Sequence, residues 1–304
     1  MGLCKGNLGN LLQHFVLMET LGAIRQRFSK HHLLFVASHA MAPWSVPSRR
    51  DGRGNGEHTF DLARLHLDRA CATDYERVWL RLSAAHGLPY PCSAAFVVEA
   101  WNGQVSLLLC ESDPGIAAEI KAWLVLPEIN WRLAGRELYE GDWRIRFSAA
   151  TKNEADLIYV EMDPMRFERH DAATCRRTPA SLYPEDLETV SRAFESDRPT
   201  LVQITSYTAN NDNPHDKVEQ TISCNLMREG FSLLERVKAD GHMVSFVYGR
   251  NVAPWPPSDA PPPNQKFHAW LEAIGRKTVG RHPVNPRSNR STGSRRRSAT
   301  TTDA

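Results

Sequence analysis

The sequence lacks the cysteine spacings, long apolar runs and nucleophile motifs that mark several large classes of protein. Its six cysteines form no Cys-x-x-Cys pair and no His/Cys zinc spacing, so we expect neither a disulfide framework nor a metal site. No apolar run reaches the roughly 18 residues needed to span a bilayer, and the N-terminus has no secretory-signal pattern. Walker loops and serine or cysteine nucleophile motifs are also missing, which argues against triphosphatases and hydrolases. These absences favour a soluble cytoplasmic protein.

The charge is divided unevenly along the chain. The formal net charge is +2 over 304 residues, but the residues after Gly275 carry +7, which leaves −5 for the rest. This end is rich in Ser, Thr and Arg and has little apolar surface to bury, so we expect it to be disordered. It is either a solvated tail or an arm that holds a nucleic-acid backbone by releasing counterions.

Helical and strand-like patterns alternate along the body of the chain, which with 41% hydrophobic content can bury a full core. The patterns predict helices at 8–28, 60–86 with a break near 72–73, 114–123, 184–194 and 216–240, and strands at 33–37, 104–110, 157–161, 200–207 and 243–248. Residues 143–147 fit a short strand or the start of a helix. The alternation predicts an α/β fold with a doubly wound, mostly parallel sheet.

The same patterns predict one α/β domain over residues 1–249, with a helical insertion at about 60–100. Six prolines between 254 and 263 indicate a stiff linker over about 250–265. A short amphipathic helix at 266–274 could dock back on the body, and 275–304 would form the basic tail.

Asp163 is the strongest candidate for a catalytic residue. It follows the apolar run Leu157–Glu161 and precedes Pro164, with Phe167 four residues further on. A buried strand that ends here would deliver the acid to the carboxyl edge of the sheet, where open α/β folds bind their ligands. The alternative is an ordinary surface turn or structural loop cap, since Asp-Pro also begins common turns.

Six segments in chain order resemble the large-subunit ribosomal RNA adenine-N6 methyltransferase family and together span more than half of the chain. They are Gly6-Asn7 through Gln13-His14, Ala37–Ala42, Tyr90–Ala94, Glu111–Pro114, Glu140–Asp142 and Asp163–Phe167. The resemblance implies a Rossmann-like methyltransferase fold and S-adenosyl-L-methionine as cofactor. It also implies RNA methylation, with a nucleic acid as partner and RNA favoured over DNA.

The resemblance also assigns roles. Glu111 would hold the ribose hydroxyls of the cofactor, Asp163 would accept hydrogen bonds from the target amine beside the cofactor, and Phe167 would stack on the base. The other residues that it places near the cofactor are His14, His39, Ser93, Gly141 and Asp142. Two of these have structural alternatives: His14 as a histidine buried within its helix, and Ser93 as a helix cap.

The chain departs from the family pattern at five positions. Met41 and Pro43 occupy or adjoin the family's glycine-rich turn, Gln13 replaces a lysine, and Met165 and Arg166 replace proline and tyrosine after the acid. A side chain in the turn opposes close approach of a cofactor. Two alternatives therefore stay open, a catalytically degenerate protein that binds nucleic acid or protein through this fold, and a methyltransferase with another acceptor.

Overall fold

The computed structural model describes residues 8–28, 30–44, 62–64, 66–67, 73–86, 90–149, 154–167, 181–195, 197–207, 215–239, 243–252 and 261–275, and only the backbone of 163–167. The strands are β1 (Leu33–Ala37), β2 (Val105–Glu111), β3 (Leu133–Glu140), β4 (Leu157–Phe167), β5 (Ser181–Leu182), β6 (Thr200–Tyr207), β7 (Ser232–Lys238) and β8 (Met243–Arg250). The helices are α1 (Leu8–Phe28), α3 (Asp74–His86), α4 (Ser93–Ala100), α5 (Pro114–Leu124), α6 (Pro127–Asn130), α7 (Trp143–Ser148), α8 (Pro184–Arg192), α9 (His215–Arg228) and α10 (Pro263–Ala273).

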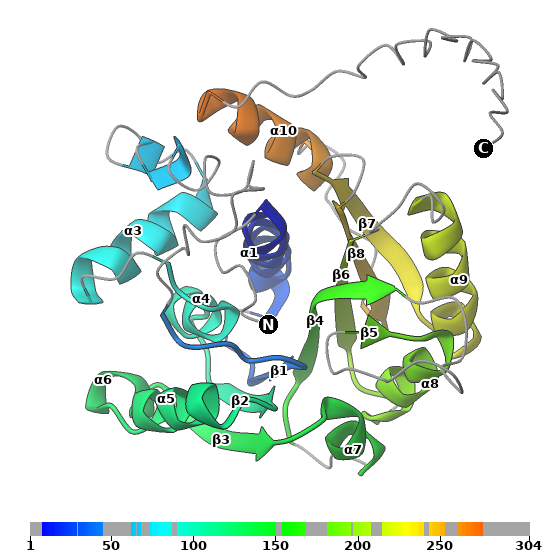
Figure 1. Cartoon of the computed structure of the whole chain (residues 1–304), viewed down its shortest axis with the longest axis horizontal. Coiled ribbons are helices and arrows are strands. Elements are labelled where there is room, and N and C mark those ends of the chain that lie inside the picture. The colour runs from blue at the N-terminus through cyan, green and yellow to red at the C-terminus, as the bar shows by residue number, and fades with distance from the viewer. Residues whose placement is uncertain are drawn as a thin grey trace, which may run out of the picture.

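One twisted sheet runs through the molecule in the order β3-β2-β1-β4-β6-β8-β7, with the short β5 paired to β4 (Figure 1). The pairs from β3 through β6 are parallel, whereas β8 runs antiparallel to both β6 and β7. The chain leaves β1 towards β2 and β3 and then returns to β4 on the other side, so the strand order reverses between β1 and β4. This is the predicted doubly wound, mostly parallel, Rossmann-like sheet, and its carboxyl edge at the reversal is where such sheets bind ligands.

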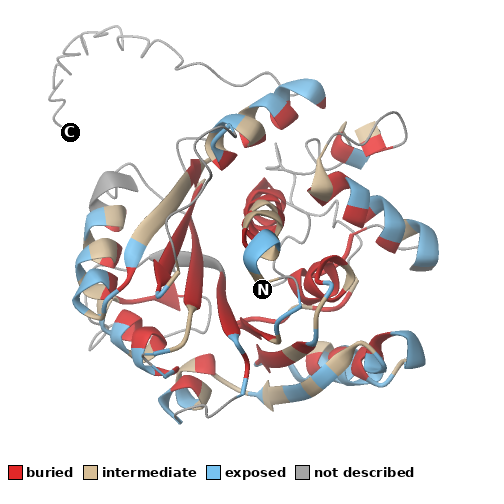
Figure 2. Ribbon diagram, turned by 180° about the vertical axis from the view of Figure 1, so that it is seen from behind, coloured by how far each residue is buried: buried red, intermediate tan, exposed pale blue. Residues whose placement is uncertain are grey.

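Helices cover both faces of the sheet and create two hydrophobic cores. Helices α1, α3, α4, α5 and α10 pack in one core, and α7, α8 and α9 pack in the other. Figure 2 shows the central strands buried between these layers, whereas the edge strands β3 and β7 are largely intermediate or exposed and the outer sides of the helices carry exposed residues. The burial of β1 and most of β2 and β4 on both faces explains why their sequences read as continuous apolar runs.

Helix α10 joins the first core although 253–260, which precede it, lie outside the described residues. Phe267 and Trp270 are buried, and both rings pack against Phe15 of α1 at centroid distances of 5.1 and 5.6 Å. The indole N–H of Trp270 donates to the buried Glu76 carboxylate at 3.0 Å. The predicted short helix is therefore present and docked, and it begins at Pro263 because proline suits the first turn of a helix.

Most of the predicted elements are confirmed, but the segment 216–240 was predicted wrongly, β4 runs beyond its predicted end at 161, and the edge strand β3 was missed. The segment 216–240 is not mostly helical, because α9 ends at Arg228 and β7 occupies 232–238. The edge strand β3 was not predicted, because its partly exposed residues carry no apolar run. Residues 143–147 belong to helix α7, and Asp142 caps that helix by accepting from the Arg144 amide N–H. The basic tail after Gly275 lies outside the described residues.

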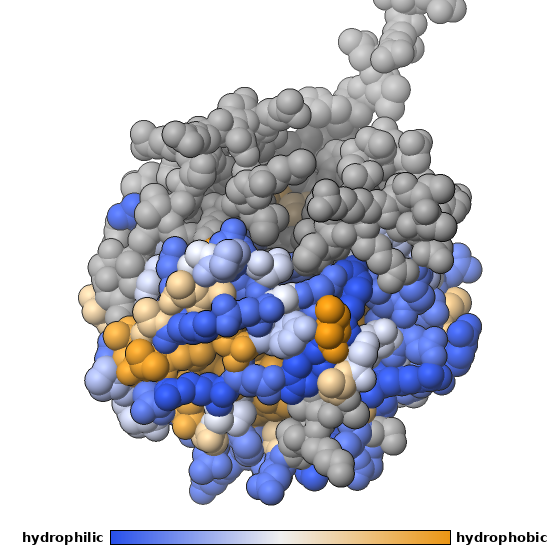
Figure 3. Space-filling model, turned by 60° about the horizontal axis from the view of Figure 1, so that its bottom comes forward, coloured by the Kyte–Doolittle hydropathy of each residue, from blue (hydrophilic) through white to orange (hydrophobic). Residues whose placement is uncertain are grey.

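The β3 edge of the molecule is mostly hydrophilic (Figure 3). Large exposed apolar side chains on and around α5, α6 and α7 include Val125, Trp131 and Ile145. Arg132 lies over the Trp131 ring at 5.2 Å and also donates to Glu99, so part of this apolar surface is used within the molecule.

Candidate functional site at the carboxyl edge of the sheet

The segments that carry the sequence resemblance converge at the carboxyl edge of the sheet, although they span more than 150 residues of the chain. Hydrogen bonds of 2.7–3.8 Å join them in pairs: Asn10 with Met41, His14 with Tyr90, Pro43 with Cys92, Ala40 with Cys110, and Glu111 with Gly141. The amide of Ser38 also donates to the carbonyl oxygen of Glu161 on β4 at 3.0 Å. Five of the six segments therefore lie side by side at this edge, and the sixth follows Glu161 on the neighbouring strand.

His14 is fully enclosed on α1. Its Nδ1 lies 2.7 Å from the hydroxyl of Tyr90, and its ring stacks on Tyr90 with 5.2 Å between centroids. The Tyr90 hydroxyl donates to the carbonyl oxygen of Asn10 at 3.2 Å, which makes the His14 Nδ1–H the donor to Tyr90. Burial lowers the pKa of His14 to about 3, so the ring is neutral near pH 7. His14 thus fixes the position of the Tyr90 turn through a side-chain hydrogen bond, whereas the structural alternative was a partly buried helix histidine bonded to backbone.

The loop after β1 holds His39 and Met41. His39 is 8% exposed, its Nδ1 lies 3.3 Å from the Ser38 hydroxyl, and its Nε2 is buried without a hydrogen-bond partner among the described residues. Burial lowers the pKa of His39 to about 4, which keeps the ring neutral. A neutral imidazole with one open nitrogen can donate to or accept from a polar ligand, according to its tautomer.

Met41 adopts φ +52°, in the left-handed region that glycine favours. The turn thus keeps a glycine-like backbone although a side chain is present. The Met41 sulfur accepts a weak hydrogen bond from the Asn10 amide at 3.8 Å, which ties the turn to α1. Pro43 has a structural role here, because its carbonyl oxygen accepts from the Cys92 amide at 2.9 Å.

Glu111 ends β2 with a carboxylate that is 5% exposed. Its Oε1 accepts from the Asp113 amide at 2.8 Å, whereas Oε2 bonds no described residue. Asp113, not Glu111, caps α5 by accepting from Gly115 and Ile116. Because the cap is already supplied, Glu111 retains an open carboxylate oxygen at the edge of the sheet, which suits a vicinal diol such as a ribose.

Gly141 and Asp142 follow β3, the neighbour of β2. The Gly141 amide donates to the carbonyl oxygen of Glu111 at 2.9 Å, which places the two strand ends side by side. The Asp142 carboxylate accepts from the amide and the guanidinium of Arg144 and remains 31% exposed. Two acids, Glu111 and Asp142, are therefore held at adjacent strand ends.

Ser93 and Gln13 complete the described part of the edge. Ser93 is the first residue of α4 and does not cap it, because Cys92 is the N-cap residue and makes no side-chain cap. Gln13 is fully buried on α1, and neither polar atom of its amide has a hydrogen-bond partner among the described residues. Buried amides without a hydrogen-bond partner are uncommon, so at Gln13 the fold holds a polar side chain that its stability does not require.

Asp163 and Pro164 lie at a bulge in β4, between the pairs Met162–Ile204 and Met165–Ser206. The strand continues to Phe167 instead of ending at Glu161, because β6 and β5 keep pairing with it. Proline has no N–H to donate, which is why it is tolerated at such an irregularity. Asp163 therefore follows the last β1–β4 pair, Ala37–Glu161, by two residues. The roles of its side chain and of Phe167 stay predictions.

Two polar side chains of this region carry no local signal in the sequence. Arg144 binds Asp142 and Asp186, and Gln203 joins α1 to the sheet. The start of α8 at Pro184-Glu185-Asp186 is readable as a helix N-terminus, but its pairing with Arg144 is a tertiary contact across 42 positions. Within the described residues, no group of three or more His, Cys, Asp or Glu side chains could hold a metal ion, and no helix is long and apolar enough to cross a membrane.

Similarity to known proteins lies in structure. No protein-family model and no curated protein matches the sequence. The solved structure of LPL1258 from Legionella pneumophila, a DUF519 protein, matches with a TM-score of 0.54 and 15% identity over 89% of this chain and 92% of that one. M. jannaschii TYW2 in complex with AdoMet matches at TM-score 0.35 with 11% identity, covering 81% of this chain and 77% of that one. The putative methylase HI0767 from Haemophilus influenzae matches at TM-score 0.38 with 8% identity, covering 77% and 88%. The first match supports the fold, and the other two are too distant to support more.

Proposed function

We propose that the protein is an S-adenosylmethionine-dependent methyltransferase that acts on the N6 amine of adenine in a nucleic acid. The observation that carries the proposal is the convergence of the sequence motifs at the carboxyl edge of the sheet, where Glu111 and Asp142 end neighbouring strands. The resemblance of these motifs to adenine-N6 methyltransferases supports the choice of acceptor.

The residues at the edge fit a nucleoside cofactor. Glu111 has one oxygen held by the Asp113 amide and one open oxygen, so the carboxylate is already oriented to accept from ribose hydroxyls. Asp142, at the next strand end, presents an acceptor to the amino group of an adenine. His39 offers an open ring nitrogen in a neutral state. S-adenosylmethionine would supply the methyl group as a sulfonium.

The acceptor side of the proposal rests on Asp163 and Phe167. A carboxylate at Asp163 would accept hydrogen bonds from the target amine and leave the nitrogen lone pair free for attack, and Phe167 would stack on the base. The basic residues after Gly275 would hold the nucleic-acid backbone, with RNA favoured over DNA. These roles agree with the position of β4 beside β1 at the reversal of strand order.

The experiment is a calorimetric titration with S-adenosylmethionine and S-adenosylhomocysteine, followed by methyl transfer from labelled cofactor to RNA and DNA. Because Met41 puts a side chain into the turn, we expect a dissociation constant on the order of 100 μM or weaker, about −5.5 kcal/mol. Glu111→Ala should weaken cofactor binding by about 1–3 kcal/mol. Asp163→Ala should abolish transfer and change cofactor affinity by no more than a few fold.

Glu137→Ala is the matched control, since this exposed acid lies on the adjacent strand β3 and, among the described residues, pairs with Arg146 and not with the residues of the proposed site. Glu137→Ala should leave both the cofactor affinity and the methyl transfer unchanged. Equal losses of binding in the Glu111 and Asp163 variants would mean that the two roles are assigned wrongly. No binding at millimolar cofactor would instead favour the catalytically degenerate alternative.

A further inference from the structure

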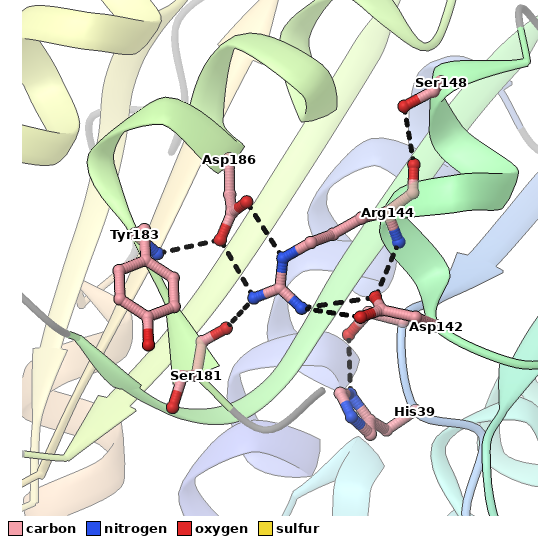
Figure 4. Close-up of polar contacts among 8 residues, drawn as sticks. His39, Asp142, Arg144, Ser148, Ser181, Tyr183 and Asp186 are labelled. Carbon is pink, nitrogen blue, oxygen red and sulfur yellow. Dashed lines mark hydrogen bonds and ion pairs between the residues drawn. The ribbon is translucent and has the colours of Figure 1, made fainter. Parts of the chain in front are cut away.

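Arg144 uses all five N–H donors of its guanidinium group to join two parts of the fold (Figure 4). Nε and Nη2 donate to the two carboxylate oxygens of Asp186 on α8, each at 2.9 Å. Nη2 also donates to the carbonyl oxygen of Ser181 on β5. Nη1 donates to both carboxylate oxygens of Asp142, each at 3.2 Å. A lysine has no such planar fork and could not reproduce this set.

The surroundings hold the guanidinium in place. The Arg144 side chain is 11% exposed and lies over the Trp143 ring at 4.7 Å and near the Tyr183 ring at 5.9 Å. Asp186 is also tied down, because its carboxylate accepts from the Tyr183 amide at 2.9 Å. A buried, bidentate and ring-stacked arginine has little freedom, so the groups that it binds share its rigidity.

Asp142 is the one partner of Arg144 that belongs to the proposed cofactor site. Its carboxylate also accepts from the Arg144 amide at 3.0 Å, so the backbone and the side chain of Arg144 both bind the Asp142 carboxylate. Asp186 is 3% exposed at the same arginine, whereas Asp142 keeps 31% of its side chain exposed. Asp142 is therefore oriented by Arg144 and still accessible to a ligand.

His39 shares this environment. Burial has the largest effect on its pKa, and the nearby charges of Asp142 and Arg144 act in opposite directions, the first raising and the second lowering it. The three groups come from the ends of β1 and β3 and from α7, so they occupy the strand ends on either side of Glu111.

We infer that Arg144 is a positioning residue of the cofactor site, which aims the Asp142 carboxylate at the exocyclic amino group of the bound adenine. The inference rests on the proposed function. An ionised carboxylate only accepts hydrogen bonds, so a fixed Asp142 favours a base with an amino group over one with a carbonyl oxygen at the same position. Arg144 would thereby set the preference of the site for adenine.

The test compares S-adenosylhomocysteine with S-inosylhomocysteine, whose base has a carbonyl oxygen in place of the amino group. Calorimetry with both ligands is done on the natural protein, Arg144→Met and Arg144→Lys. We expect the natural protein to bind the adenine ligand about tenfold more tightly, the ratio expected for one charge-assisted hydrogen bond. Arg144→Met should reduce this ratio towards one. Arg144→Lys keeps the positive charge and should give an intermediate ratio. It replaces Arg144→Met as the test variant if Arg144→Met does not fold.

Asp186→Asn is the matched control, because it weakens the other end of the same pair without changing a contact of Asp142. It should lower the melting temperature and reduce the ligand ratio less than Arg144→Met does, because Asp186 anchors the guanidinium but does not contact Asp142. An unchanged ratio in folded Arg144→Met, or an equal fall in Asp186→Asn, would overturn the inference. If the natural protein binds neither ligand, the proposed function itself fails, which is a distinct outcome.

Discussion

Buried polar side chains are bonded differently in two regions of the sheet, the network around Gln203 on β6 and the carboxyl ends of the parallel strands. In the first region, Gln203 accepts from the Tyr159 hydroxyl at 2.5 Å and donates to Ser245 and to the carbonyl oxygen of Gln13. Thr205 and Ser245 bond each other at 3.0 Å. At the carboxyl ends of the parallel strands, the Gln13 amide and the Nε2 atom of His39 have no such partners among the described residues.

The difference indicates which region of the sheet binds a ligand. A satisfied buried network contributes rigidity and leaves nothing for a ligand, whereas an unsatisfied buried group lowers stability until something binds it. The carboxyl ends of the parallel strands also carry Glu111, Asp142 and the strained Met41 turn. We therefore assign stability to the network around Gln203 and ligand recognition to the carboxyl ends of the parallel strands, and each prediction below changes one side of that comparison.

The largest effect is expected from removing α10, which packs against both α1 and β7. A chain that ends at residue 260 loses the buried side chains of Phe267, Trp270 and Leu271, each worth about 1.5–3 kcal/mol. It also removes one of the hydrogen bonds that the buried Glu76 carboxylate accepts. We expect a fall in melting temperature of many degrees or failure to fold, measured by circular dichroism.

The control for that truncation is a chain that ends at residue 275, which keeps α10 and removes only the basic segment. It should melt within a few degrees of the full chain, since the removed residues are Ser/Thr/Arg-rich and poor in apolar side chains. A large loss in this variant would show that the segment contributes to the core, contrary to the composition.

The next effect concerns acid stability. Burial lowers the pKa values of His14 and His39 to about 3 and about 4, below the unfolded value of 6.5. The unfolded chain thus binds more protons, so stability falls as the pH drops from about 6.5 towards these values. At pH 5 the protonation of each histidine in the unfolded chain should have lowered the free energy of unfolding by about 2 kcal/mol. Denaturant unfolding at pH 7 and pH 5 measures this loss, and His14→Asn should remove about half of it.

The sequence predicted the strands that are buried on both faces better than the edge strands β3 and β7, for a physical reason. Strands β1, β2 and β4 are buried on both faces and therefore appear as apolar runs, and Asp113 with Pro114 marks the start of α5 directly. Strand β7 mixes charged with apolar residues and follows α9 after three residues, so it was merged with that helix. Site residues at strand ends could be predicted from local pattern, but Arg144 and Gln203 act through tertiary contacts that no local pattern contains.

The two buried glutamines offer a direct test of the comparison. Gln203→Leu should lower the free energy of unfolding by about 1–3 kcal/mol, because the buried Tyr159 hydroxyl loses the acceptor Gln203 and Ser245 loses one of its two hydrogen bonds. Gln13→Leu removes an amide without partners and should leave stability unchanged or raise it by up to about 1 kcal/mol. Chemical denaturation measures both. Similar losses in the two variants would mean that Gln13 contributes to stability as Gln203 does.

The smallest effect is expected at the Met41 turn. A non-glycine residue at φ +52° costs about 1 kcal/mol relative to glycine, but Met41→Gly also loses the contact with Asn10 and adds freedom to the unfolded chain. The net change in unfolding free energy should therefore stay within about 1 kcal/mol.

Asn251, at φ +56° after β8 in the antiparallel half, is the matched control, because asparagine tolerates this conformation and lies away from the carboxyl edge. Asn251→Gly should change neither stability nor S-adenosylhomocysteine affinity measurably. Met41→Gly should instead tighten that affinity several fold, because loss of the side chain opens the turn to the ligand. If both variants leave the affinity unchanged, the Met41 side chain does not limit access, and the weak binding expected here needs another cause.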